Sequence, residues 1–298
     1  MLGQYLITFR EVLEAALIIM IVFAYLKRTK RVQYSKYVWY GVLIAIAVSF
    51  ILGIAIWILY GGISDSAKKL FEGTAALIAV FVLTTMILWM ATKGKEVKDE
   101  VEQKLDTITT DGMVLGLVLF SFIAVFREGL ETVLFLTPFM VDDVSGTILG
   151  AAVGIATSLG LSYMIFVVGM NINLRKFFYF TSILLVFLAA GLIGYGIHEL
   201  IEYQGGAQIG WFGEYAYNLN IPKDHLLHHK GPIGSVFAVM FGYTVKAEWG
   251  RVIFHMAYLV IFLPLVLWFY ENPVIMSLEK RIKSIIHKLI PAKKEVET

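Results

Sequence analysis

The stretch FREVLEAALI, at Phe9–Ile18, returns in nearly the same form as FREGLETVLF at Phe126–Phe135. Each copy places one arginine and two glutamates inside a run of apolar residues. On a helix, the two glutamates of a copy are three residues apart and share a face, and the arginine lies four residues before the second glutamate. The sequence therefore predicts two similar helices that each carry a compact charged group in apolar surroundings.

The composition of the chain is that of an integral membrane protein. Of its 298 residues, 58% are hydrophobic and only 16% are charged, whereas a soluble domain is closer to half apolar and a quarter charged. The absence of cysteine excludes disulfides, iron–sulfur clusters and thiolate metal sites, which leaves oxygen and imidazole ligands for a metal. The formal net charge of +2 is too small to indicate nucleic acid as a partner. The apolar composition makes membrane lipid the expected surrounding.

Hydropathy predicts seven membrane-spanning helices, because an apolar run of about 20 residues crosses a bilayer as a helix. We place them near Tyr5–Leu26, Val38–Tyr60, Phe71–Ala91, Gly112–Thr137, Gly146–Met170, Phe177–Ile201 and Arg251–Tyr270. Seventeen Lys and Arg residues fall in the loops and tail on one side, and six fall on the other side. The positive-inside rule then predicts a cell-membrane protein with its N-terminus outside and its C-terminus in the cytoplasm.

The charged motif is part of a longer internal repeat. Gly41–Ser49 in the second span resembles Gly150–Ser158 in the fifth, and the third and sixth spans align more weakly. Two repeats of three spans each must have opposite orientations in the membrane, an arrangement typical of transporters whose substrate site lies at the junction. We therefore predict an all-α integral membrane protein with seven transmembrane helices, built as a 3+3 inverted repeat plus one C-terminal helix.

This architecture divides the chain into six segments. They are a first three-helix repeat (1–91), a cytoplasmic linker (92–111), a second three-helix repeat (112–201), an extracytoplasmic loop with a re-entrant or interfacial segment (202–250), the seventh transmembrane helix (251–270) and a cytoplasmic basic amphipathic tail (271–298). The loop is too long for a simple turn. Its apolar part is too short to cross a bilayer.

The motif charges need compensation in the middle of the membrane. A charged side chain at the centre of a transmembrane helix costs about 2.5–3.5 kcal/mol on translocon scales. Two arginines balance two of the four glutamates, and a bound cation or protonation would remove the remaining deficit. Four carboxylates form a site of hard oxygen ligands, for which ferric iron, manganese, calcium and magnesium are all candidates. The predicted ligands are Glu11, Glu14, Glu128 and Glu131.

Taken together, Arg10–Glu14 and Arg127–Glu131 resemble the paired R-E-x-L-E motifs of the oxidase-dependent, high-affinity iron permease family, which includes the fungal ferric permease and prokaryotic relatives. The resemblance covers essentially the whole membrane part. It implies seven helices with an external N-terminus, iron as the transported substrate and no organic cofactor. It also assigns the iron site to the four motif glutamates, with Arg10 and Arg127 supporting their geometry. An extracytoplasmic ferroxidase or iron-delivery protein is the partner it implies.

Further acidic and histidine residues gather on the predicted outer side. They begin the third span and end the sixth, and we predict that they form an outer access site that concentrates cations. A solvated helix end is the alternative explanation. The residues of this outer access site are Glu72, His198, Glu199 and Glu202. A metal role for the loop histidines His225, His228 and His229 is left open.

The sequence favours a transporter over an enzyme. No G-x-x-x-x-G-K-[ST] phosphate-binding motif is present, which favours a secondary carrier. We predict a permease for iron, as ferric ion after or coupled to oxidation of ferrous ion. The alternatives are a carrier of another cation such as lead or manganese, and an intramembrane carboxylate-bridged metalloenzyme, whose sites usually pair Glu-x-x-His on facing helices. The energy source and a homo-oligomeric state are left open.

Overall fold

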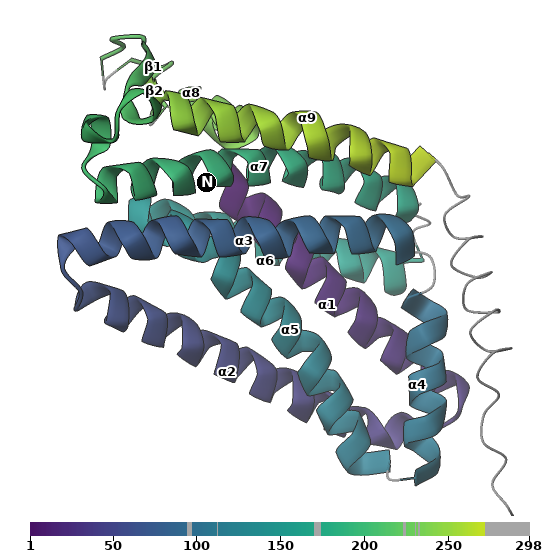
Figure 1. The fold of residues 1–298 in the computed structure, drawn as a ribbon. Helices are drawn as coiled ribbons and strands as arrows, with labels where there is room; N and C mark the ends of the chain where they lie inside the picture. The colour runs from purple at the N-terminus through teal and green to yellow at the C-terminus, as the bar shows by residue number, and fades with distance from the viewer. Residues whose placement is uncertain are drawn as a thin grey trace, which may run out of the picture.

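The computed structural model describes residues 1–93, 97–111, 113–169, 174–222, 225–229, 231 and 233–271. Within these residues the chain is almost entirely helical (Figure 1). The seven long helices are α1 (Leu2–Arg28), α2 (Ser35–Gly61), α3 (Asp65–Lys93), α5 (Met113–Asp142), α6 (Val144–Phe166), α7 (Leu174–Tyr203) and α9 (Trp249–Glu271). Two shorter helices are α4 (Val97–Asp111) and α8 (Gly234–Phe241).

Five of the long helices, α2, α3, α6, α7 and α9, are long and apolar enough to cross a membrane. The other two long helices, α1 and α5, have 27 and 30 residues, which is similar to the lengths of these five. They differ from the five in carrying the motif charges in their middle. All seven coincide with the predicted apolar runs, with ends that differ by a few residues. The chain is thus an all-α membrane protein in its main architecture. The predicted tail, 271–298, lies outside the described residues except for the last residue of α9.

The loop after α7 contains the β-structure of the described residues, which the prediction of an all-α fold did not include. Strand β1 (Tyr215–Asn218) pairs antiparallel with β2 (Lys246–Glu248). The predicted re-entrant or interfacial segment contains α8, whose eight residues are too few to cross a bilayer. Three short 3-10 helices complete the described elements, at Val32–Tyr34, Gly206–Ile209 and Trp211–Gly213.

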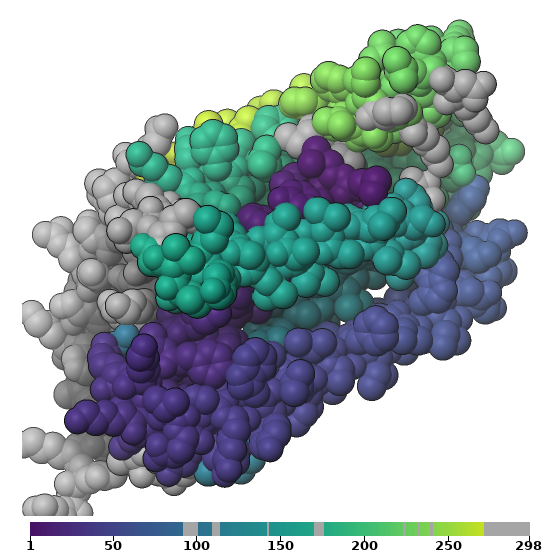
Figure 2. Space-filling model, turned by 180° about the vertical axis from the view of Figure 1, so that it is seen from behind, coloured from purple at the N-terminus to yellow at the C-terminus, as the bar shows by residue number. Residues whose placement is uncertain are grey.

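The long helices pack in pairs that join the two halves of the chain. Helix α3 packs along α7, and α9 covers α7 from the other side (Figure 1). Helix α1 packs mainly on α6, α2 packs mainly on α5, and α1 also contacts α5. On the reverse face, α6 lies across α1, whose purple atoms appear on both sides of it (Figure 2). The first helix of each half therefore packs on the second helix of the other half.

Two glycines let these exchanged pairs approach closely. A side chain at Gly41 of α2 would collide with the carbonyl oxygen of Val118 in α5, and one at Gly150 of α6 would lie 2.8 Å from the carbonyl oxygen of Met1. Small residues at helix contacts allow such close approach in membranes, where van der Waals packing drives helix association. The two glycines thus set how closely α1 and α5 sit against their partners.

Replacing Gly150 by alanine is expected to lower the thermal stability of the purified protein in detergent. The new Cβ would press on the Met1 carbonyl, and overpacking of this kind costs about 1–3 kcal/mol. Gly160→Ala on the same helix is the matched control, because a Cβ there would meet no atom of the described residues within 4 Å. Equal melting temperatures for the two variants would contradict the close contact of α6 with α1.

The predicted linker 92–111 contains α4, which packs across one end of α1 and α5. Leu105 of α4 is fully buried in a hydrophobic cluster with residues of both helices. The Tyr25 hydroxyl donates a 2.5 Å hydrogen bond to Asp106, and Arg28 forms a 2.8 Å ion pair with Glu102. The segment between the two halves is therefore fixed to the end of α1.

Candidate metal centre

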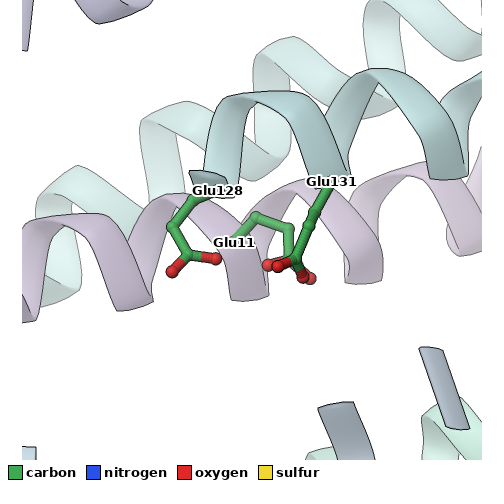
Figure 3. Close-up of side chains that lie close together, drawn as sticks. All are labelled: Glu11, Glu128 and Glu131. Carbon is green, nitrogen blue, oxygen red and sulfur yellow. The ribbon is translucent and has the colours of Figure 1, made fainter. Parts of the chain in front are cut away.

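Glutamates from both motifs come together where α1 contacts α5. Glu11, Glu128 and Glu131 each offer a carboxylate oxygen, and these oxygens lie within 4.8 Å of one another. Figure 3 shows the three carboxyl groups gathered between the two helices. Oxygens that bind one ion at about 2.0–2.6 Å are at most about 5 Å apart, so this spacing suits a single cation. No other group of this kind occurs among the residues that the structure describes.

Arg10, the positive charge of the first motif, is buried inside the protein. It is 1% exposed, as is Glu11. Its Nη1 donates to Glu11 at 2.9 Å, and its Nη2 lies 2.6 Å from Glu14, at the predicted spacing of four residues. Nη1 also lies 3.0 Å from the Met86 sulfur of α3. One guanidinium thus contacts both glutamates of its motif and a neighbouring helix.

Arg127 is the equivalent charge of the second motif, but half of its side chain is exposed. Its Nε and Nη2 donate to the same oxygen of Glu128 at 3.0 and 2.5 Å, and its Nε lies 3.7 Å from Glu131. The predicted Arg127–Glu131 pair is present but longer than the contact with Glu128. The guanidinium lies 5.7 Å from the centre of the Trp89 ring of α3.

The fourth predicted ligand, Glu14, is placed differently from the other three. It is buried and paired with Arg10, and it does not belong to the group of oxygens within 4.8 Å. In that group, the Oε2 atoms of Glu11, Glu128 and Glu131 are buried and have no hydrogen-bond partner among the residues that the structure describes. Four carboxylates face two guanidiniums, so the site has two negative charges to neutralise by cations or protons.

The second motif has glycine where the first has valine, and the packing of α2 explains the difference. Ser49 of α2 lies against Gly129, and a Cβ at this position would collide with the Ser49 hydroxyl. The hydroxyl is buried and makes no hydrogen bond with the described residues. Glycine at this position therefore lets α2 approach the backbone of α5 next to Glu128.

Glu72, the first residue of the predicted outer access site, is buried between three helices. Its carboxylate accepts hydrogen bonds from the Tyr60 hydroxyl of α2 at 2.6 Å and from the Tyr195 hydroxyl of α7 at 2.7 Å. Both carboxylate oxygens therefore have protein partners. This arrangement joins α2, α3 and α7 at one end of the molecule, independently of any role in cation binding.

The other three residues of the outer access site lie at the end of α7. His198 hydrogen-bonds Glu248 of β2 at 3.1 Å, and Glu202 forms a 2.6 Å ion pair with Lys69. Burial tends to raise the pKa of Glu248, but the hydrogen bond and charge of His198 outweigh it, and the pKa is lowered. Glu199 makes no hydrogen bond or ion pair with the described residues.

The loop histidines are close in space but do not form a metal group with other described residues. The rings of His228 and His229 are 4.2 Å apart, and His228 is buried. Nδ1 of His225 accepts a hydrogen bond from the backbone of Leu227. These contacts account for part of the loop structure and give no support to a histidine metal site.

A cavity of about 560 Å³ lies away from the motif glutamates, between β1, α8 and the start of α9. Its lining is mostly aromatic and aliphatic, with Arg251 and His255 as the basic side chains. It contains no carboxylate. Because hard cations need several oxygen ligands, we place the candidate metal centre at the glutamates and not in this cavity.

Sequence reasoning missed the contacts of both sites: besides the partners of Glu72 and Glu202 described above, three further residues were not predicted. Met86 and Trp89 contact the two arginines, and Glu248 contacts His198. The α3 residues lie 38 or more positions from the arginine they contact, so no local spacing could indicate these pairs. Glu248 lies 50 positions from His198, so spacing could not indicate this contact either.

The family of the chain follows from comparison with known sequences. The sequence model of the iron permease FTR1 family matches residues 1–267. The chain belongs to this family. This FTR1 family member is 45% identical over 268 residues to an uncharacterized protein of Archaeoglobus fulgidus. The aligned residues cover 89% of this chain and 94% of the relative. No solved structure matches the chain.

Two further relatives of this FTR1 family member carry functional names. The ferrous iron permease EfeU of Escherichia coli is 36% identical over 264 residues, 87% of this chain and 93% of the relative. The ferrous iron permease EfeU of Yersinia pestis is 35% identical over 277 residues, which cover 92% of this chain and 94% of the relative. The predicted family is therefore confirmed, and a permease is indicated. The role of the motif glutamates stays a prediction.

Proposed function

We propose that this FTR1 family member is an iron permease of the cell membrane and binds iron among Glu11, Glu128 and Glu131, with Glu14 as the fourth carboxylate. The observation that carries this proposal is three glutamates whose carboxylate oxygens come within 4.8 Å of one another, each with a buried Oε2 atom that has no hydrogen-bond partner among the described residues. A buried acceptor without a partner costs about 1–3 kcal/mol, and more when it is charged. One cation that binds all three carboxylates removes these costs together.

Ferric iron is the cation we propose. The donors are carboxylate oxygens, which prefer hard ions, and the site has twice as many carboxylates as guanidiniums. We propose that ferrous iron is oxidised by an extracytoplasmic ferroxidase, which takes the electron, before the ion reaches this site. The printed names of the relatives make ferrous iron the competing substrate. Manganese and lead ions are the other competitors.

We further propose that α1 and α5 complete seven membrane spans arranged as two inverted repeats. Equivalent contacts support this: Gly41 lies on Val118, and Gly150 lies on Met1. Met1 and Val118 are 117 positions apart, the same separation as between the two motifs. Helices α1 and α5 then cross the bilayer in opposite directions, with the N-terminus outside. Rocking of the two halves would expose the junction to each side in turn.

Glu199 is our candidate for the first carboxylate that an incoming ion meets, since its neighbours in the outer access site already have protein partners. In a transport assay, Glu199→Gln is expected to raise the iron concentration needed for half-maximal uptake. The maximal rate should stay the same, because the variant leaves the central glutamates intact. A lowered maximal rate with unchanged half-saturation would contradict this role.

Uptake of radiolabelled iron into proteoliposomes tests the proposed function. Vesicles that contain the purified protein are supplied with ferric citrate, or with ferrous iron kept reduced by ascorbate, and empty vesicles serve as the control. We expect uptake from ferric citrate and weaker uptake from ferrous iron. Excess manganese or lead should compete poorly. Uptake of manganese or lead in preference to iron would overturn the choice of cargo.

A further inference from the structure

One turn of α3 contacts both motif arginines. Arg10 reaches the Met86 sulfur at 3.0 Å, and Arg127 lies 5.7 Å from the centre of the Trp89 ring. Met86 and Trp89 are three residues apart and therefore share a face of α3. The arginines come from α1 and α5, so this turn is a place where both halves of the candidate metal centre are held by the same element.

Neither contact supplies a negative charge. A thioether sulfur is a weak hydrogen-bond acceptor, and the face of an indole ring attracts a guanidinium through its quadrupole. A carboxylate in either position would act as a further ligand for a hard cation, whereas sulfur and indole would not. The turn can therefore stabilise two guanidiniums next to a metal site without binding the metal itself.

Each arginine shares its glutamates with the proposed cation. Arg10 and Arg127 donate to the Oε1 atoms of Glu11 and Glu128, while the Oε2 atoms of the same carboxylates have no hydrogen-bond partner within the described part of the chain. A cation that draws these carboxylates toward itself weakens both ion pairs and repels both guanidiniums. The guanidiniums then need partners that hold them without opposing the cation.

We propose that Met86 and Trp89 are positioning residues that hold Arg10 and Arg127 beside the candidate metal centre when the carboxylates turn to the cation. By doing so they strengthen iron binding. This inference rests on the proposed function, because it assumes that iron binds at the motif glutamates. Two simpler roles compete with it: Trp89 as a ring at the membrane interface, and Met86 as a packing residue or direct ligand.

Double-variant cycles on the full-length protein in detergent separate these roles. For each variant, the dissociation constant for ferric iron is measured, with the iron supplied as ferric citrate. Trp89→Leu is expected to weaken iron binding by about 2-fold to 30-fold, the range of a cation–π contact, and Trp89→Phe by less because a ring remains. Met86→Leu keeps the volume and should weaken binding by about 2-fold to 10-fold.

The decisive result is which arginine each effect depends on. The Trp89→Leu effect should disappear when Arg127 is already glutamine, and it should persist when Arg10 is glutamine. The Met86→Leu effect should show the opposite dependence. Effects that persist in every background would overturn the inference, because an interfacial ring, a packing residue or a direct sulfur ligand would act independently of the arginines.

Folding and the parent proposal are controlled separately. If Arg10→Gln does not fold, Arg10→Lys takes its place. The Trp89–Arg127 cycle then decides whether the positioning role holds, because Arg127 is half-exposed and its replacement is expected to disturb folding less. If the wild type binds iron and Glu128→Gln does not, but no cycle shows dependence, only the positioning role is wrong. If Glu128→Gln binds iron like the wild type, the proposed function itself is wrong.

Discussion

Replacing Glu128 by glutamine is expected to lower iron uptake by at least about 100-fold. Loss of a residue that merely supports a metal ligand costs about 10–100-fold, and Glu128 is proposed as a ligand itself. Glutamine has nearly the same shape, so the variant removes the charge while the helix contact of α5 with α1 is kept. Glu11→Gln is expected to have the same effect from the other helix, because both carboxylates are buried in one group.

Radiolabelled iron uptake into proteoliposomes checks this result, with melting curves to show that each variant is folded. Glu102→Gln is the matched control: Glu102 pairs with Arg28 between α4 and α1, away from the group of three glutamates. It should transport iron at nearly the rate of the wild type. Normal uptake by Glu11→Gln and Glu128→Gln would leave the buried carboxylates with a purely structural role.

Arg10→Gln is expected to destabilise the folded protein by about 3–5 kcal/mol. Removing one partner of a buried ion pair leaves an uncompensated charge in a low dielectric, and this is the usual size of that cost. Arg10 contacts two buried carboxylates, so Glu11 and Glu14 both lose a partner. Thermal unfolding in detergent, in the absence of iron, measures the effect.

The second motif provides the comparison. Arg127→Gln removes the equivalent charge, but Arg127 is half-exposed and closely paired with one buried carboxylate, Glu128, instead of two, so the loss of stability should be clearly smaller. The double variant Arg10→Gln with Glu14→Gln should recover part of the stability, because one of the two uncompensated carboxylates is removed as well. Equal destabilisation by the two arginine variants would contradict the difference in burial between the motifs.

Much of the fold could be predicted from the sequence because membrane helices are set by local composition. An apolar run of sufficient length must form a helix in a bilayer, since every backbone polar group needs an internal partner there. The short strand pair was missed, because β1 and β2 are only four and three residues long and are separated by 27 residues. Their pairing depends on how the loop returns over α9.

The candidate site was predictable in part for the same reason. The spacing of Glu128 and Glu131 puts them on one face of α5 in any helix, and Arg10 reaches Glu14 within α1. The structure then separates residues that the sequence treats alike. Glu11 joins the group of three carboxylates while Glu14 stays with Arg10, because the relative rotation of α1 and α5 decides which side of each helix faces the other.

The sequence by itself determined which helices carry charge, how the charges are spaced and that carboxylates outnumber arginines, because these properties belong to one helix at a time. Only the tertiary structure decided that Arg10 is buried while Arg127 is half-exposed. It also decided that one turn of α3 contacts both arginines. Those features depend on the packing of α1, α3 and α5. How these three helices pack depends on the side chains of all three surfaces together, so the spacing of residues along any one helix cannot predict it.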